Sequence, residues 1–132
     1  MSLTATPIYA ALLAFVLIFL SIRVIRTRRT AKVALGDGGD QRLLRASRAQ
    51  ANFAEYVPMA LLLIGFAELQ GAPVLAIHGL GVVLLAGRLV HVYGVSQEDE
   101  DFRLRVRGMQ LTFLAVASAA ILILVQTVLR MV

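Results

Sequence analysis

The chain has 132 residues, of which 59% are hydrophobic, and its mean hydropathy is +0.81. Soluble domains contain about 45–50% apolar residues, so this composition excludes an ordinary soluble domain. Lys and Arg number 13 against 8 Asp and Glu, and the absence of Cys excludes disulfides, iron–sulfur centres and thiolate zinc sites. An apolar excess with a basic balance predicts helices in lipid and charges gathered at one membrane face.

Four apolar stretches follow one another along the chain, at residues 7–25, 53–69, 73–95 and 108–129. Each approaches the roughly 20 residues that a helix needs to cross about 30 Å of hydrocarbon. They do not alternate as the strands of a membrane barrel would, so we expect helices. No basic residue precedes the first stretch, and we therefore expect a retained span rather than a cleaved signal peptide.

The basic residues decide the expected topology. Nearly all lie in or beside the segments 26–47 and 96–107, whereas residues 1–6 and the turn at 70–72 carry none. Positive loops remain in the cytoplasm, so both segments are predicted to be cytoplasmic loops and both termini to lie on the non-cytoplasmic side. The predicted fold is all-α: residues 1–132 form a single integral membrane domain, a four-helix bundle of left-handed up-down topology. In a bacterium it would be a multi-pass protein of the inner (plasma) membrane.

The connections contain residues that are typical of turns and caps. The run 36–40 (GDGGD) predicts a flexible loop, and the aspartate that ends it predicts the N-cap of a helix that begins at Gln41 and continues into the second span. The run 71–73 (GAP) predicts a tight turn with Pro at the start of the next helix. Glu68 and Gln70, beside this turn, are expected to be solvated at the outer membrane interface.

A polar stripe enters the second span from its basic end. Arg48, Asn52, Glu55 and Tyr56 are spaced i, i+4, i+7 and i+8, which places them on one face of a helix. A carboxylate inside the bilayer is costly unless it is paired, so Glu55 is expected to meet a cation; such a pair is often only a polar staple between helices. Here the partner could be Arg48 or an arginine of another span, and further basic residues are expected at the same membrane level: Arg88, His91, Arg103, Arg105 and Arg107. Several convergent arginines indicate an anionic ligand, because guanidinium groups bind carboxylates in a bidentate fashion.

Three segments resemble one known family. The segment 48–58 (RAQANFAEYVP) resembles the signature of the MAPEG family, the membrane-associated proteins in eicosanoid and glutathione metabolism. The segments 88–94 (RLVHVYG) and 105–109 (RVRGM) resemble its later motifs, and the similarity covers nearly the whole chain. The resemblance implies a homotrimer that binds glutathione between its subunits, near the cytoplasmic face, and takes a lipophilic second substrate from the surrounding membrane lipid.

The resemblance also implies roles for individual residues. Carried over by position, the residues that bind glutathione would be Arg48, Gln50, Asn52, Glu55, Tyr56 and Arg88, with Arg28 and Arg29 near the ligand. Arg105 would be the catalytic residue that stabilises the glutathione thiolate. A free thiol has a pKa of about 8.5, and a neighbouring guanidinium lowers that pKa by favouring the charged form.

The chain departs from the family pattern at one position. The tyrosine that contacts the ligand in the eicosanoid synthases falls on Val95, and Tyr93 lies roughly 200° away around a helix. Tyr93 and Arg103 are therefore only possible site residues, as is His91, which could equally be an interfacial hydrogen-bonding group. Arg103, Arg105 and Arg107 are spaced by two, so at most one of them can fully share a given face; the distance to Gly108-Met109 favours Arg105.

Three functions agree with these features. The first is a glutathione transferase or peroxidase of the membrane, with glutathione as co-substrate, no metal ion and no nucleic-acid partner. The second is a non-enzymatic, lipid-binding protein of the same fold, which would not need the residues that bind a tripeptide. The third is a small four-helix exporter, but such transporters carry a membrane-embedded Glu in the first span, and residues 7–22 contain no acid.

Overall fold

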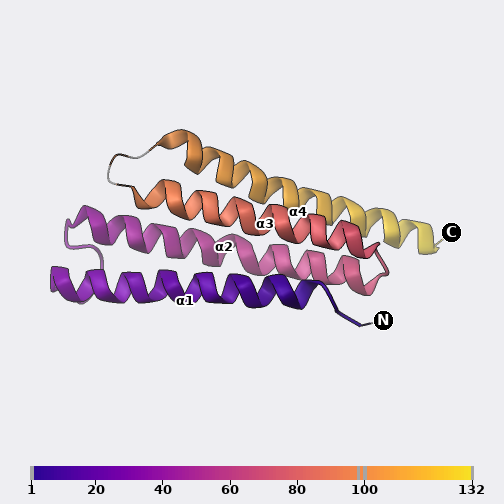
Figure 1. Cartoon of the computed structure of the whole chain (residues 1–132), viewed down its shortest axis with the longest axis horizontal. Coiled ribbons are helices and arrows are strands. Elements are labelled where there is room, and N and C mark those ends of the chain that lie inside the picture. Colours follow the sequence, from indigo (N-terminus) through magenta and orange to yellow (C-terminus); the bar gives the residue numbers. More distant parts are fainter. Residues whose placement is uncertain (1, 98, 100, 132) are drawn as a thin grey trace.

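The computed structural model describes residues 2–97, 99 and 101–131. In this part of the chain it has four helices: α1 (Thr6–Ala31), α2 (Gln41–Leu69), α3 (Val74–Ser96) and α4 (Phe102–Met131). Each is long and apolar enough to cross a membrane. The helices run alternately in opposite directions, so that the start of α1 and the end of α4 lie at the same end of the bundle (Figure 1). The predicted all-α, four-helix membrane fold is confirmed; the membrane side that each end faces stays a prediction.

The helices begin and end at residues with clear local causes. As predicted, Asp40 caps α2: its side chain accepts hydrogen bonds from the backbone nitrogens of Arg42 (2.8 Å) and Leu43 (3.0 Å). Gly71, with a φ of 83°, provides the left-handed residue of the turn between α2 and α3. The helices continue beyond the predicted spans, because apolar runs stop at the first charged residues whereas arginine is a good helix former. The irregular connection between α1 and α2 is therefore only residues 32–40.

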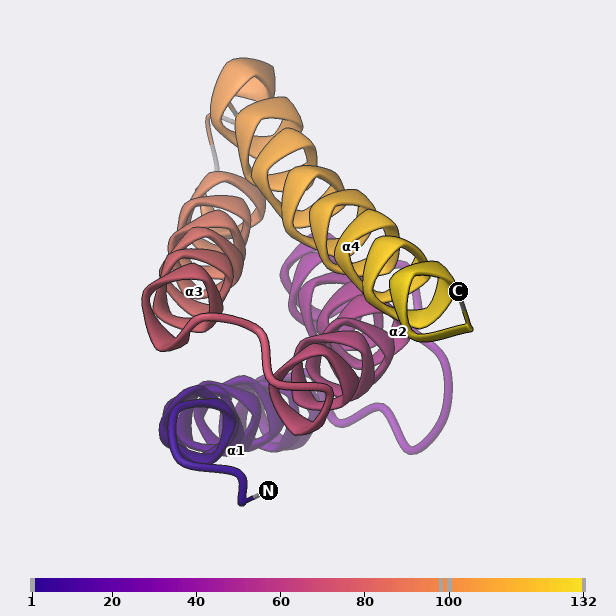
Figure 2. The same ribbon diagram turned by 90° about the vertical axis from the view of Figure 1, so that its right-hand side faces the viewer.

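The two middle helices form the centre of the bundle. α2 and α3 each contact all three other helices, whereas α1 and α4 do not touch within the described residues. Figure 2 shows α4 crossing the bundle obliquely, on the opposite side from α1. The fully buried large side chains include Leu13 and Leu20 of α1, Phe53 and Ile64 of α2 and Leu84 of α3. Polar side chains of α2 and α3 that point inward are therefore enclosed by protein.

Glycines hold α3 and α4 close together. A β-carbon built on Gly108 would lie 2.5 Å from the backbone nitrogen of His91, and one built on Gly94 would lie 2.9 Å from that of Arg105. On Gly87 it would lie 2.9 Å from the β-carbon of Leu111. Small residues allow such close approach of membrane helices. This contact fixes Arg88, the one arginine of α3, relative to the arginines of α4.

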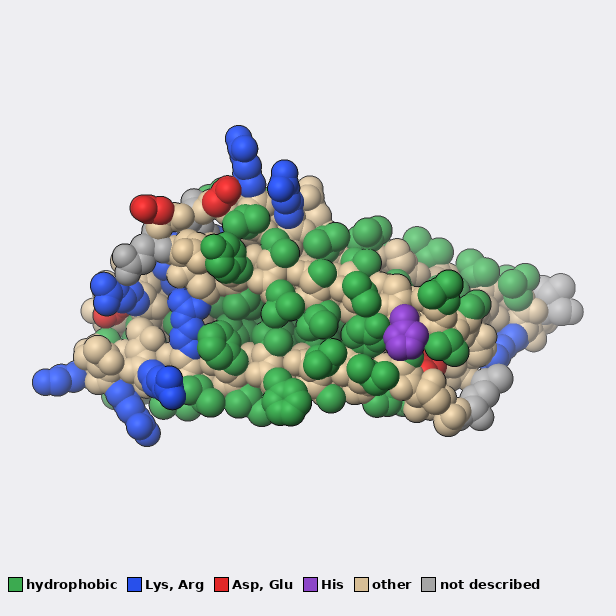
Figure 3. All heavy atoms as spheres, viewed as in Figure 1, with side chains coloured by type: hydrophobic (Ala, Val, Ile, Leu, Met, Phe, Trp, Pro, Cys, Tyr) green, Lys and Arg blue, Asp and Glu red, His purple; other side chains and the backbone are tan. Residues whose placement is uncertain are grey.

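The surface separates charge from apolar area along the bundle. In Figure 3 the blue Lys and Arg side chains gather at the end that carries the α1–α2 and α3–α4 connections, and a broad green band covers the middle. Arg130, near the end of α4, lies at the opposite end and donates to the backbone oxygen of Gln70. We call the two ends the basic end and the capped end.

The capped end corrects one prediction. Glu68 is not solvated but only 7% exposed. Its carboxylate accepts hydrogen bonds from the backbone nitrogens of Thr4 (2.7 Å), Ala5 (2.7 Å) and Thr6 (2.8 Å), and from the hydroxyl of Thr4 (2.9 Å). The physical reason is that the first amides of a helix have no partner within the helix and attract an anion. An acidic residue at the end of α2 thus caps the start of α1.

Two further polar pairs lie near the capped end. The hydroxyl of Tyr9 lies 2.9 Å from Nδ1 of His78, and the two rings meet edge to face. Tyr9 packs over Gly81, where any β-carbon would overlap its ring. The side-chain nitrogen of Gln70 donates to the hydroxyl of Thr127 at 3.2 Å, so Gln70 is also a structural contact rather than a solvated group.

Candidate functional site

A hollow lined by arginines lies at the basic end, between the start of α2, the end of α3 and the start of α4. Its volume is about 240 Å³. It is lined by Gln41, Leu44, Arg45, Arg48, Val95 and Arg105. Arg45 also donates to the backbone oxygen of Gln97 at 2.9 Å, which ties α2 to the end of α3. We call this pocket the arginine hollow; its lining combines two residues from the predicted site, Arg48 and Arg105, with the position where the family tyrosine is missing.

Arg88, in the interior of the bundle near the basic end, is a buried cation with neutral partners. It is fully buried, and its partners are neutral: Asn52 Oδ1 at 2.7 Å, Thr112 Oγ1 at 3.3 Å and Met109 Sδ at 3.7 Å. Its guanidinium carbon lies 6.0 Å from the centre of the Phe53 ring. The buried Nε of Arg88 has no hydrogen-bond partner. A buried cation without an anion is strongly disfavoured, so this group has unused capacity to bind a negative charge.

The remaining residues of the stripe face two directions. Asn52 and Tyr56 turn toward α3 and α4; the Tyr56 ring meets the ring of Phe113 edge to face, with 5.5 Å between their centres. Glu55 is exposed on the free face of α2, and Arg48 is exposed where it lines the arginine hollow. Glu55 lies 14 residues before the end of α2, which is about 21 Å of helix, so it lies well within a hydrocarbon layer about 30 Å thick. A carboxylate at that depth is costly where it faces lipid.

The three spaced arginines of α4 separate onto two faces. Arg105 lines the arginine hollow. Arg103 and Arg107 instead line a different hollow on α4, together with Phe102, Val106 and Gln110. The structure therefore brings Arg105 to Arg48 and places the other two elsewhere.

Three residues of the predicted site lie on the α1 side of the single chain. Arg28 donates to the backbone oxygens of Val33 (3.3 Å), Ala34 (3.3 Å) and Gly36 (2.9 Å), and so holds the loop after α1. Arg29 is exposed. Gln50 faces α1 and donates to the hydroxyl of Ser21 at 2.9 Å. Within one chain, these three residues do not line the arginine hollow.

The possible site residues on α3, Tyr93 and His91, differ in burial. Tyr93 is 60% exposed on the outer surface of α3, whereas Val95 is buried at the arginine hollow. His91 is buried and its backbone packs directly against Gly108. In the single chain Tyr93 therefore lies away from Val95 and the arginine hollow, as its two-residue offset along the helix predicts.

Sequence reasoning missed two residues that hold Arg88. Thr112 is fully buried, and its hydroxyl also donates to the backbone oxygen of Gly108 at 2.8 Å. Met109 lies one turn earlier and offers its sulfur. The available signal was a threonine inside an apolar run, four residues after a glycine, a spacing that places both on one face. Nothing in the sequence indicated that this face meets Arg88.

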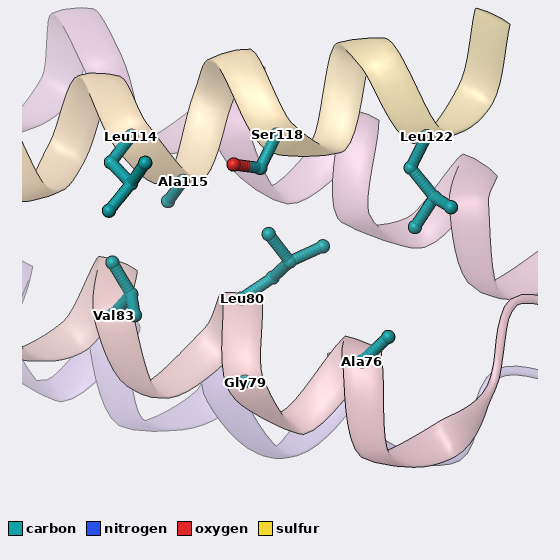
Figure 4. Close-up of a pocket in the computed structure, with 8 residues that line it drawn as sticks. All are labelled: Ala76, Gly79, Leu80, Val83, Leu114, Ala115, Ser118 and Leu122. Atoms are coloured by element: carbon teal, nitrogen blue, oxygen red, sulfur yellow. The ribbon is translucent and has the colours of Figure 1, made fainter. Parts of the chain in front are cut away.

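A second hollow, farther from the charges, lies between α3 and α4. Figure 4 shows leucine and valine side chains from both helices pointing into it, with Ser118 as its polar residue. Its volume is about 420 Å³. The contact of Gly87 with Leu111 and Gly108 closes it toward the basic end. Because Ser118 follows Arg105 by 13 residues, or about 20 Å of helix, this hollow carries none of the site's chemistry.

The arrangement favours anion binding over metal binding. In residues 2–97, 99 and 101–131, no group of three or more His, Asp or Glu side chains could hold a metal ion. His78 lies at the capped end with Tyr9, about 20 Å along α3 from His91. What converges instead is guanidinium groups, Arg48 and Arg105 in the hollow and Arg88 beneath it, which suit carboxylates or a thiolate.

Comparison with known proteins identifies the family of the chain. The model of the MAPEG family matches residues 6–125. The chain is 43% identical over 110 residues to the inner membrane protein YecN of Escherichia coli (strain K12), covering 83% of this chain and 82% of that one. YecN of E. coli O6:H1 (strain CFT073) is similar to the same extent. The family match covers all of α1, α2 and α3 and most of α4. The chain is a multi-pass membrane protein and belongs to the MAPEG family.

Proposed function

We propose that this protein is a membrane transferase or peroxidase that uses glutathione, with its active site at the basic end and toward the cytoplasm. The observation that carries the proposal is Arg88, a fully buried guanidinium whose partners are all neutral. A group of this kind is retained in membrane helices chiefly for function. Family membership supports glutathione as the anion, since the family includes glutathione transferases.

The cations at the basic end suit the two carboxylates of glutathione. No described acidic side chain lies within ion-pair distance of Arg48 or Arg88, so each guanidinium can bind a carboxylate. We assign one carboxylate to Arg88, assisted by Asn52, and the other to Arg48. Tyr56 completes the contacts made from the same chain. Gln50, Arg28 and Arg29 lie on the α1 side, so in this proposal they reach glutathione from the neighbouring subunit of the trimer.

Arg105 is proposed to stabilise the thiolate. A guanidinium near the sulfur lowers the pKa of the thiol, so a larger fraction is the nucleophilic thiolate at neutral pH. In the transfer reaction the proton of the thiol goes to water, the sulfur forms a bond to an electrophilic carbon, and the leaving group departs with the bonding electrons. In the peroxidase reaction two glutathione molecules give a disulfide while the peroxide is reduced to an alcohol and water.

Glu55 supports a proposed homotrimer. Its carboxylate is exposed on the free face of α2 at a depth where lipid contact is costly. A second copy of the chain packed on this face would remove it from lipid and leave Glu55 to bind the amine of glutathione. The lipophilic second substrate then enters from the bilayer, beside the same subunit boundary.

The test is calorimetry of detergent-solubilised protein titrated with glutathione. We expect heat of binding in the wild-type protein and its loss in Arg48→Ala. Arg107→Ala is the matched control, because Arg107 is an exposed arginine at the same end that lines another hollow. Absence of heat in the wild type would overturn the proposed function, and equal affinity in Arg48→Ala would overturn the proposed site.

Two further measurements separate the roles. The ultraviolet absorbance of the bound thiolate should fall in Arg105→Ala while glutathione binding persists. Conjugation of a lipophilic aryl chloride should fall in the same variant. Unchanged thiolate absorbance in Arg105→Ala and its loss in Arg103→Ala would move the role to Arg103.

A further inference from the structure

A separate basic hollow lies on α1. Its volume is about 310 Å³, and it is lined by Phe19, Ile22, Arg23, Arg26 and Thr27. Arg23 crosses to α3 and donates to the hydroxyl of Ser96, which donates in turn to the backbone oxygen of Val92 at 2.5 Å. The side chain of Arg23 is thus positioned before any ligand binds. None of its five lining residues belongs to the proposed glutathione site.

The hollow has an excess of positive charge. Arg23 and Arg26 are three residues apart on one helix face, where like charges repel. The hydroxyl of Thr27 donates to the backbone oxygen of Arg23 at 2.9 Å and so does not offset either charge. No described acidic side chain lines the hollow or pairs with these two arginines. An anion placed between the two guanidiniums would remove this repulsion.

The order of residues along α1 shows which kind of anion fits. Arg23 follows Thr6 by 17 residues, or about 25 Å of helix, so it lies close to the limit of a hydrocarbon layer about 30 Å thick. Phe19 and Ile22, on the membrane side of the arginines, are 61% and 43% exposed. A ligand that contacts the whole hollow therefore has a negative group at the interface and an apolar chain directed into the bilayer.

The hollow on α4 that contains Arg103 and Arg107 lacks this order. There Phe102 lies on the far side of the arginines from the membrane, and Gln110 lies on the membrane side. An acyl chain would meet an amide rather than an aromatic ring. The comparison shows that the arrangement on α1 is not simply a property of every basic helix end in this chain.

We propose that the hollow formed by Phe19, Ile22, Arg23, Arg26 and Thr27 binds an anionic phospholipid. Its phosphate lies between the guanidiniums of Arg23 and Arg26, and the first part of an acyl chain lies against Phe19 and Ile22. Arginines at the cytoplasmic end of a membrane helix attract anionic lipid head groups. Because Arg23 also holds Ser96, the bound lipid braces the end of α3, next to Val95 of the arginine hollow.

The test is native mass spectrometry of the detergent-solubilised protein with phosphatidylglycerol, and with phosphatidylcholine of the same acyl chains. The wild type should retain phosphatidylglycerol in preference. The double variant Arg23→Gln/Arg26→Gln should lose this preference by roughly thirtyfold, since each basic group near an anionic lipid contributes about a fivefold factor. The control Lys32→Gln/Arg42→Gln removes two charges from the same end outside the hollow and should change the preference little. Circular dichroism checks that each variant is helical.

Each alternative has its own outcome. Equal retention of the two lipids by the wild type, or an equal loss in the control variant, would overturn the proposal in favour of general attraction to the basic end. Displacement of phosphatidylglycerol by inorganic phosphate, which then stays bound alone, would overturn the lipid as ligand. Arg26→Gln keeps the Arg23–Ser96 contact, so this single variant serves if the double variant does not fold. Phe19→Ser, which changes no charge, should also lower lipid retention.

Discussion

The polar side chains at the two ends of the bundle differ in their partners. At the capped end, Glu68 meets the first amides of α1, Tyr9 meets His78, and Gln70 meets Thr127. At the basic end, Arg88 is buried among neutral partners, and Arg48 lines a hollow without a described acidic neighbour. These three capped-end contacts are satisfied within the fold, whereas the buried Nε of Arg88 has no hydrogen-bond partner, and we propose that Arg88 is kept for a ligand.

The largest expected effect tests Arg88 as a ligand group. Arg88→Met should lower the affinity for glutathione by about thirtyfold to several thousandfold, because losing one partner of a buried charged hydrogen bond costs about 2–5 kcal/mol. The thermal unfolding temperature should not fall, because the variant also removes a buried cation. Calorimetry measures the glutathione affinity, and circular dichroism measures the unfolding temperature. A large fall in unfolding temperature with unchanged glutathione affinity would show that Arg88 stabilises the fold and does not bind the ligand.

The glycine contact between α3 and α4 should come next in magnitude. Gly108→Ala places a β-carbon 2.5 Å from the backbone nitrogen of His91 and should destabilise the protein by about 3 kcal/mol, at the upper end of overpacking effects. Gly79→Ala is the matched control, since nothing lies within 4 Å of the added carbon. Thermal unfolding in detergent compares the two. Equal unfolding temperatures would contradict the close packing of α3 on α4.

Glu68 tests the capped end. Glu68→Ala leaves the amides of Thr4, Ala5 and Thr6 without their acceptor and should lower the free energy of unfolding by about 2 kcal/mol. Glutathione affinity should not change, because the carboxylate lies at the opposite end from the site. Glu68→Gln keeps one acceptor oxygen and should have a smaller effect. A loss of glutathione binding in Glu68→Ala, in protein that remains helical, would break the distinction between the two ends.

The smallest effect concerns Tyr9. Tyr9→Phe removes the hydrogen bond to His78 but keeps the ring over Gly81, and should lower the free energy of unfolding by about 1 kcal/mol. His78→Phe should have a similar effect, and the double variant should cost little more than either single one, because the two groups form one pair. Fully additive effects would show that Tyr9 and His78 do not interact.

The fold was predictable from the sequence because its causes are local. Apolar length, the Asp40 cap and the Gly71 turn each depend on neighbouring residues, and the structure confirms them. The ends of the helices were harder to predict. A helix that leaves the bilayer continues through arginines, and no apolar residues there mark its last turns. The stripe on α2 was readable only in part. Helical spacing groups Arg48, Asn52 and Glu55, but in the structure Asn52 turns toward Arg88 while Arg48 and Glu55 are exposed.

Contacts between distant residues were not predictable in the same way. The Glu68 cap joins residues more than 60 positions apart, and the prediction that Glu68 is solvated was wrong because nothing local distinguishes a capping carboxylate from a free one. The neighbours Thr112 and Met109 of Arg88 depend on the rotation of α4 against α3, which the glycines determine. Arg28, on the α1 side, holds the loop after α1 by donating to the backbone oxygen of Gly36, a role that the family pattern does not describe.

The Glu68 cap has a consequence for how the chain enters the membrane during synthesis. α1 is made first, but its acceptor becomes available only when the last turn of α2 has been translated. Until then, the start of α1 relies on water or lipid head groups. The natural unit of insertion is therefore the α1–α2 helical hairpin. Glu68 of α2 joins the two helices at the ends that lie far from their connecting loop.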